Sequence, residues 1–320
     1  MTYSKFISFI CFFTFISCIS TSNEPVTKSQ PQNAPQKTTT SIEAPKPISQ
    51  TFDFDHPTFY PKDREAILQR LKDKVAAKQD LVIHAFVPLC DNENQGIVPV
   101  SKALGDGQNP KTNLYWGAMY GIKNHFTKSS KWKCIAVQTN VEQPLLERVI
   151  FQRKTSNGTL VYLVADAYDG SKMRNCVVDY LQSLAGRMMD KIVIDGKKLQ
   201  VYANADLLVF NGHDGLMDYN DIPYFLNTQE KEKNMKAKDA VMIACYSGNF
   251  FRPFLQKAGA YPLVVTNGLM APEAYVLEAI LEQWIQLKPA ETIRKSAGMG
   301  YNQYQKCGTR GADRLFSTGW

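Results

Sequence analysis

The stretch that decides the fold is Asp206-Leu207-Leu208-Val209-Phe210-Asn211-Gly212-His213-Asp214-Gly215, followed after a polar spacer by Ala240-Val241-Met242-Ile243-Ala244-Cys245-Tyr246-Ser247-Gly248. Each half is a short apolar run that ends in small residues, which is typical of a buried parallel strand. Residues 221–238 between them are long enough for the crossover that two parallel strands require. Because the carboxyl ends of neighbouring parallel strands open on the same edge of a sheet, we expect His213 and Cys245 to meet there. A thiol beside an imidazole is the minimum equipment for nucleophilic catalysis.

These two blocks resemble the signature of the caspase, legumain, gingipain and separase cysteine peptidases, in which one apolar strand ends at a His-Gly turn and another at Ala-Cys. The block that begins at Ala244 is most similar to the legumain version, where Ser-Gly follows one residue after the nucleophile. The resemblance implies an α/β fold, a caspase-like three-layer sandwich around a mostly parallel sheet with hairpin insertions. It also implies peptide hydrolysis through a thioester on Cys245, with His213 as general acid and base and no cofactor. One position differs from the family, because Asp214 separates His213 from Gly215.

The chemistry of such a site sets further expectations. A free thiol is only slightly ionised at neutral pH, so Cys245 needs activation. Its place between a strand and a helix predicts that helix amides lower its pKa. We expect backbone amides near Asp214, Gly215 and Cys245 to hold the oxyanion, because small residues let a substrate carbonyl approach the main chain.

Three carboxylates are candidates for binding a cationic group of the substrate. Asp91 lies in a long polar loop after the first strand, which is a candidate for contacts with a substrate or an ion, and Asp166 and Asp169 stand at the end of a later strand. The alternatives are a solvated loop for Asp91, and helix capping ahead of residues 173–185 for the other two. The four histidines are spread without ligand spacing, so no metal site is expected.

The first 17 residues read as a signal peptide of the lipoprotein type. Lys5 precedes an apolar run, residues 6–16, that is too short to span a bilayer. Phe15-Ile16-Ser17-Cys18 resembles a bacterial lipobox, which implies lipidation of Cys18. An ordinary secretory signal is the alternative. Either interpretation predicts export, and the first places the protein on the bacterial cell envelope, held to the membrane by a lipid anchor.

Residues 18–51 are rich in Ser, Thr, Pro and Gln, and we expect a disordered tether there because little in them can pack. Residues 52–320 are expected to form the α/β domain; the 320-residue chain is 44% hydrophobic, enough for a full core. The net charge of +7 is scattered along the chain and does not indicate a nucleic-acid partner. We expect the protein to be a monomer whose partner is a peptide or protein substrate.

Periodicity and turn residues predict the remaining elements. Helices are expected over residues 61–78, 114–126, 173–185, 250–258 and 272–287. Strands are expected over 81–89, 132–139 and 261–266, with hairpins over 148–167 and 192–202. Helix and strand alternate from Met173 onward, which indicates a doubly wound sheet. Residues 293–320 carry no clear pattern.

Three functions remain open. The first is an anchored cysteine peptidase. The second is an inactive relative that binds a ligand or protein at the same edge of the sheet, which the extra Asp214 favours. The third is a structural envelope lipoprotein in which His213 and Cys245 belong to the core. With Cys11 and Cys18 removed or lipidated, five of the seven cysteines remain, and an odd number leaves at least one thiol unpaired in an exported protein.

Overall fold

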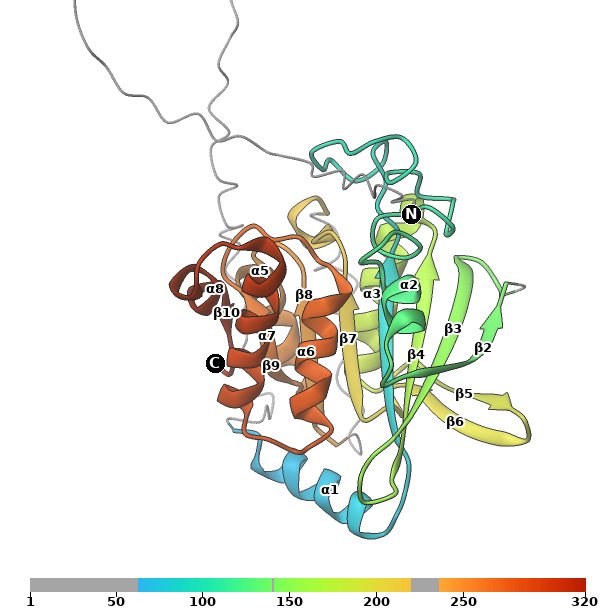
Figure 1. The fold of residues 1–320 in the computed structure, drawn as a ribbon, viewed down its shortest axis with the longest axis vertical. Helices are drawn as coiled ribbons and strands as arrows, with labels where there is room; N and C mark the ends of the chain where they lie inside the picture. The colour runs from blue at the N-terminus through green and yellow to red at the C-terminus, as the bar shows by residue number, and fades with distance from the viewer. Residues whose placement is uncertain (1–62, 140, 220–235) are drawn as a thin grey trace, which may run out of the picture. The chain divides into compact units, whose positions relative to one another are not determined.

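The computed structural model describes residues 63–139, 141–219 and 236–320, and its centre is an eight-stranded sheet with the order β10-β9-β8-β7-β1-β4-β3-β2 (Figure 1). The five strands from β9 to β4 in this order are parallel, and β10, β3 and β2 each pair antiparallel with a neighbour. The fold is therefore α/β with a mostly parallel sheet, as the alternating pattern predicted. The strands are β1 Leu81–Pro88, β2 Lys133–Gln138, β3 Leu145–Lys154, β4 Leu160–Tyr168, β7 Leu207–Asn211, β8 Asp239–Ile243, β9 Tyr261–Thr266 and β10 Phe316–Ser317.

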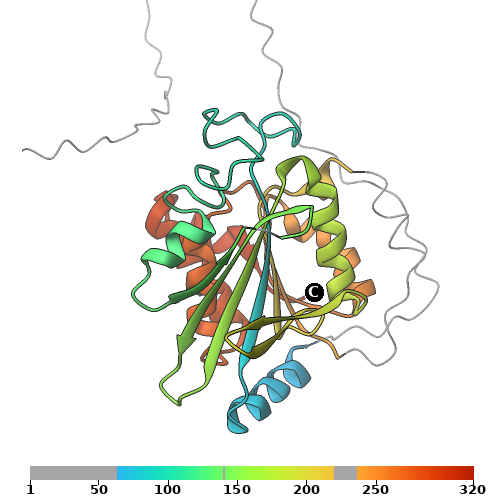
Figure 2. The same ribbon diagram turned by 90° about the vertical axis from the view of Figure 1, so that its right-hand side faces the viewer.

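Helices cover both faces of this sheet. The first core packs α1, α2, α6 and α7 against one face, and the second packs α3, α5 and the separate β5–β6 hairpin against the other. Figure 2 shows α3 on one side of the sheet and the C-terminal helices on the other. Every residue of β1, β7, β8 and β9 is buried, which explains their continuous apolar runs. The remaining elements are α1 Glu65–Ala76, α2 Ile122–Lys128, η1 Gly170–Lys172, α3 Met173–Leu184, β5 Met189–Ile194, β6 Lys197–Tyr202, η2 Gly215–Met217, α5 Ser247–Ala258, α6 Ala274–Trp284, α7 Ala290–Gln305 and α8 Thr309–Leu315.

Most expected elements are present within a few residues of their predicted bounds, including both hairpins. The helix expected over residues 114–126 is wrong, because only Ile122–Lys128 is helical. The Asn113 side chain organises this segment instead: its Oδ1 accepts from Cys90 N at 3.0 Å and its Nδ2 donates to Cys90 O at 2.8 Å. A side chain that bonds to the main chain in this way favours turns over a helix.

The C-terminal segment, residues 293–320, shows no clear sequence pattern, and it folds as most of α7, α8 and the edge strand β10. Arg294 in α7 joins these elements, since its Nη2 donates to Asp313 Oδ1 at 2.7 Å and its Nη1 donates to Phe316 O at 3.2 Å. The segment is therefore held by polar contacts that have no signature in the local sequence.

Two sets of predictions lie outside the described residues. The signal peptide, Cys18 and the tether fall within residues 1–62, and most of the expected crossover falls within residues 220–235. Each helix among the described residues is too short or too polar to span a bilayer.

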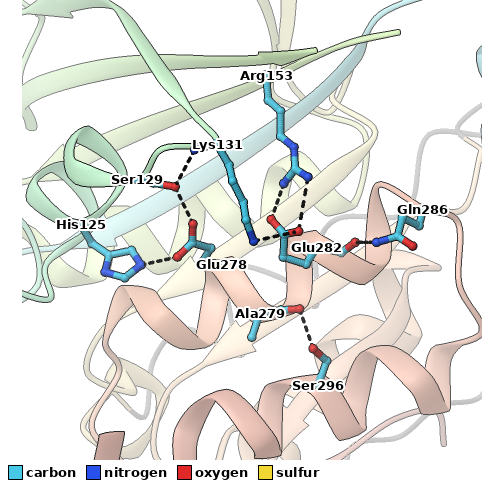
Figure 3. A network of polar contacts seen from close by, with 9 residues as sticks. All are labelled: His125, Ser129, Lys131, Arg153, Glu278, Ala279, Glu282, Gln286 and Ser296. Carbon is cyan, nitrogen blue, oxygen red and sulfur yellow. Dashed lines mark hydrogen bonds and ion pairs between the residues drawn. The ribbon is translucent and has the colours of Figure 1, made fainter. Parts of the chain in front are cut away.

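A polar network fixes α6 to the segment around α2 (Figure 3). Glu278 in α6 accepts a hydrogen bond from Ser129 Oγ at 2.7 Å, and its other oxygen lies 2.7 Å from His125 Nε2. One turn further along α6, Glu282 pairs with Arg153 and Lys131. Although it contains Ser, His and Glu, the network is not a catalytic triad, because Ser129 and His125 both bond to the carboxylate. It holds α6, and α6 begins directly after a loop that matters for the candidate site.

Candidate functional site

Strands β7 and β8 are neighbours in the sheet and run parallel, as predicted. Their register pairs Asn211 with Ile243, and Gly212 N donates to Ile243 O at 3.1 Å. His213 and Cys245 each follow the paired residue by two positions. The two residues therefore follow adjacent parallel strands at equivalent positions, at the carboxyl edge of the sheet.

The Cys245 sulfur lies against the loop that joins β9 to α6. Met270 N donates to Cys245 Sγ at 3.3 Å, and Sγ lies 3.4 Å from Met270 O as a donor. The residue is partly buried and packs against the first core, on the face of the sheet that carries α6 and α7. Both hydrogen-bonding functions of the thiol are thus engaged by a single residue of the loop.

The expectation that helix amides lower the pKa of Cys245 is wrong. Burial raises the pKa of this thiol, the Met270 amide partly offsets that rise, and the nearby Asp214 carboxyl adds to it. The reason is geometric, because the amide that reaches the sulfur comes from Met270 rather than from α5. The resting side chain is a neutral thiol, so any nucleophilic role needs a base to remove its proton.

The Ser-Gly pair after Cys245 has a structural explanation. Ser247 is buried and its Oγ donates to Met242 O at 2.9 Å, while Thr266 N donates to Ser247 Oγ at 3.0 Å. A Cβ at Gly248 would lie 3.0 Å from Thr266 O. Ser247 and Gly248 therefore lock the end of β8 to the end of β9. Tyr246, before them, is left-handed with φ of 49°, a strained backbone for a residue other than glycine.

His213 has a carboxylate partner that the sequence analysis missed. Its Nε2 lies 2.6 Å from Asp218 Oδ2, and their side chains are 12% and 39% exposed. A carboxylate on one ring nitrogen fixes the orientation of the imidazole and leaves the other nitrogen, Nδ1, for a second partner. The sequence did contain a sign of this partner, because an acidic residue follows the histidine by five positions, just past the Gly215 turn.

Asp214, the residue that departs from the family pattern, is fully buried. Its Oδ1 accepts from Leu216 N at 3.0 Å and so caps η2, while Oδ2 has no hydrogen-bond partner among the described residues. Burial raises the pKa of this carboxyl well above its usual range, and the Leu216 amide opposes the rise. Burial therefore favours the protonated form of this carboxyl. Asp214 is fully buried and Gly215 is buried, so neither amide is open to a substrate, and of the three residues expected to supply the oxyanion amides only Cys245 is partly exposed.

The long polar loop after β1 reaches the histidine side of this edge. A Cβ at Gly96 would lie 3.7 Å from Asp218 Oδ1, and Gly96 itself has a positive φ of 58°. The loop that the sequence singled out for substrate contacts thus lies beside the His213–Asp218 pair.

Asp166 is not available to a substrate, which corrects the prediction that it binds a cationic group of the substrate. It is fully buried, and Arg148 donates to it from Nε at 2.6 Å and from Nη2 at 2.7 Å. His84 Nε2 lies 2.9 Å from its Oδ2, and Tyr202 N donates to His84 Nδ1 at 2.9 Å. With Nδ1 an acceptor, the ring is neutral, in line with burial that lowers the pKa of His84. The cluster joins β6 to the central strands.

Asp91 and Asp169 are also engaged within the protein. Asp91 Oδ1 accepts from Glu93 N at 2.9 Å and its Oδ2 accepts from Asn94 Nδ2 at 2.9 Å, so it shapes the polar loop. Asp169 Oδ1 accepts from Ser171 N at 2.9 Å and caps η1, just before α3. The capping alternative is thus confirmed for Asp169, and the prediction that it and Asp91 attract a cationic group has no support in their contacts.

The described cysteines are all free thiols: Cys90, Cys134, Cys176, Cys245 and Cys307. No group of three or more metal-ligating side chains is found among the residues that the structure describes. Comparisons with protein-family models, with curated proteins and with solved structures gave no match. Support for a function therefore comes from the geometry of this chain alone.

Proposed function

We propose that the protein is a cysteine peptidase of the caspase-like fold, with Cys245 as nucleophile and His213 as general acid and base. The observation that carries the proposal is the β7–β8 register, in which the two residues follow adjacent parallel strands at equivalent positions. The Asp218 partner of His213 supports it further, because a base held by a third group is the usual arrangement around an activated nucleophile.

The chemistry follows from the neutral thiol. His213 removes the proton from Cys245 Sγ as the sulfur attacks the scissile carbonyl carbon, and the backbone amide of Cys245 holds the oxyanion. The tetrahedral intermediate collapses to a thioester when His213 gives that proton to the leaving amine. Water, deprotonated by His213, then attacks the thioester, and the thiol regains its proton as the acid is released. Asp218 orients the imidazole and stabilises its charged form in each step.

Export and anchoring belong to the same proposal. The N-terminal apolar run and the lipobox-like Phe15-Ile16-Ser17-Cys18 support secretion with a lipid on Cys18, followed by a tether to residue 51. The substrate is then a peptide or protein met at the bacterial envelope by a monomeric, membrane-tethered enzyme. Mass spectrometry of the mature N-terminus tests this step, since cleavage that does not leave Cys18 first contradicts it.

One observation favours a second function, an inactive relative that binds a ligand or protein. Burial raises the pKa of Cys245, and the nearby carboxyl of Asp214 raises it further. A thiol that resists ionisation suits a binding protein better than a nucleophile, so the two functions differ in whether Cys245 reacts with a peptide-directed electrophile.

The test is labelling of the full chain, reduced and folded, with biotinylated peptide acyloxymethyl ketones, located by mass spectrometry. The peptidase proposal predicts modification at Cys245 that is lost in His213→Ala, while the other four described cysteines stay unmodified. Retention of the thermal transition in His213→Ala shows that the loss is not unfolding. No modification of Cys245 in the folded protein would sink the peptidase proposal and leave the binding protein.

A further inference from the structure

The loop between β9 and α6 is fastened to the nucleophile segment on both sides of a single residue. Tyr246 N donates to Gly268 O at 3.0 Å, and Met270 N donates to Cys245 Sγ at 3.3 Å. Leu269 lies between Gly268 and Met270. Since neighbouring Cα atoms are about 3.8 Å apart, Leu269 is held within one residue of the atoms that contact the sulfur.

The rest of the loop is equally well anchored. Asn211 Nδ2, at the end of β7, donates to Pro272 O at 2.9 Å, and Ala271 N donates to Tyr301 OH at 3.2 Å. The network in Figure 3 then fixes α6, which begins at Ala274. A loop whose main chain is bonded at four consecutive or near-consecutive positions is a preorganised platform rather than a mobile strap.

Leu269 is an apolar side chain left in water at this platform. It is 70% exposed, although the backbone on either side of it is engaged. On the histidine side of the site a second apolar residue has the same character: Val98 is 82% exposed and lies two residues after Gly96, which adjoins Asp218. Leu269 thus precedes the residue that contacts Cys245 Sγ, and Val98 lies two residues after the glycine beside Asp218.

Recognition of a basic substrate side chain by aspartates has little support at this site. Asp91 and Asp166 are buried and have both carboxylate oxygens engaged inside the protein, so neither is left to pair with a basic side chain of a substrate. Asp169 uses Oδ1 to cap η1, and Asp218 uses Oδ2 to hold His213.

We propose that the site selects peptides with an apolar side chain beside the scissile bond, and that Leu269 is the principal specificity-determining residue, with Val98 contacting a neighbouring substrate residue. The inference rests on the proposed peptidase function and names its substrate class. Burying Leu269 against an apolar side chain removes both surfaces from water, whereas a charged side chain there loses hydration without gaining a partner.

The test compares three acyloxymethyl ketone peptides that differ only in the residue next to the ketone: Leu, Arg or Gly. On the full chain, we expect the Leu probe to label Cys245 about tenfold faster than the Arg or Gly probe, the size of a typical apolar pocket contact. Leu269→Glu should remove that advantage by weakening the binding constant for the Leu probe while leaving the rate with the Gly probe unchanged. Met189→Glu, at an exposed methionine of β5 in the separate hairpin, is the matched control and should change neither rate.

The outcomes separate the two proposals. Labelling of Cys245 that is fastest with the Arg probe, or a Leu preference that persists in Leu269→Glu, overturns the apolar specificity while the peptidase stands. Equal loss of all three rates in Leu269→Glu, with unchanged thermal unfolding, shows a general effect on the site and also overturns it. Absence of labelling with every probe removes the peptidase proposal and this inference with it.

Discussion

Asp218 Oδ2 lies 2.6 Å from Nε2 of His213, five residues earlier in the chain. The pair spans the η2 turn, which Asp214 caps through Leu216 N. A turn with a buried cap thus brings a carboxylate back to the ring of the proposed base.

Asp218→Asn is expected to lower the rate of Cys245 labelling by about a hundredfold, the lower end of the range of general acid–base contributions. The amide cannot stabilise the charged imidazole, so the pH dependence of labelling should shift together with its rate. The measurement is the second-order labelling rate across pH. Asp190→Asn, an exposed carboxylate on β5, is the control, and an equal effect of both changes would contradict a positioning role for Asp218.

Cys245→Ala should abolish labelling and change the free energy of unfolding by about 1 kcal/mol or less, because the thiol is only partly buried. Cys176→Ala is the matched comparison, since Cys176 is fully buried in α3 and packs in the second core. Its removal should cost about 1–2 kcal/mol and leave labelling intact. Denaturant unfolding and mass spectrometry check both variants. A larger loss of unfolding free energy in Cys245→Ala than in Cys176→Ala would support a structural role for Cys245 instead.

Asp214→Asn is expected to stabilise the protein at neutral pH. Burial raises the pKa of Asp214 in the folded state above that in the unfolded chain, so the folded state binds the extra proton. The stability that this group provides is complete below pH ~4 and is lost as pH rises through the folded pKa. Asparagine keeps the acceptor for Leu216 N and has no charge to bury. The gain in melting temperature should therefore shrink towards pH 4, and a gain that does not depend on pH would contradict this account.

Arg148→Ala should cost about 3–5 kcal/mol, because it leaves the buried Asp166 carboxylate without its main partner. Arg153→Ala is the control. Arg153 pairs with the partly exposed Glu282, and removing it should cost about 1 kcal/mol or less. Chemical denaturation of the two variants measures the difference, and equal costs would show that the Asp166 cluster is not a buried ion pair in solution.

The same cluster predicts an acid limb of stability. Burial opposes the ionisation of Asp166, but hydrogen bonds from Arg148 prevail and lower its pKa to about 2. The folded value lies below that of an unfolded aspartate, ~3.9, so its stabilising contribution is present above pH 4 and is lost as pH falls towards 2. Melting temperatures of the wild type and Arg148→Ala should therefore converge on acidification. A constant gap down to pH 2 would contradict the assignment.

The sequence was most informative where burial alone decides the pattern. The continuous apolar runs of β1, β7, β8 and β9 indicate strands that are covered on both faces. The Asn-Gly and Asp-Gly pairs indicate the two hairpins. It misled where a side chain outside the element decides the outcome. Residues 114–121 have helical periodicity, but Asn113 binds both the amide and the carbonyl of Cys90 and holds the segment in turns.

The sequence by itself determined that two buried strands end just before His213 and Cys245, because hydrophobic runs and small residues encode strand ends locally. Only the tertiary structure decided what surrounds them. Asp166 faces Arg148 across paired strands, Met270 reaches the sulfur from a loop 25 residues away, and Asp218 reaches the imidazole after a turn capped by a buried acid. These contacts depend on strand order and loop path, which arise from packing of the whole sheet. For that reason the candidate dyad could be read from the chain, while its partner, the state of its thiol and its exposed Leu269 could not.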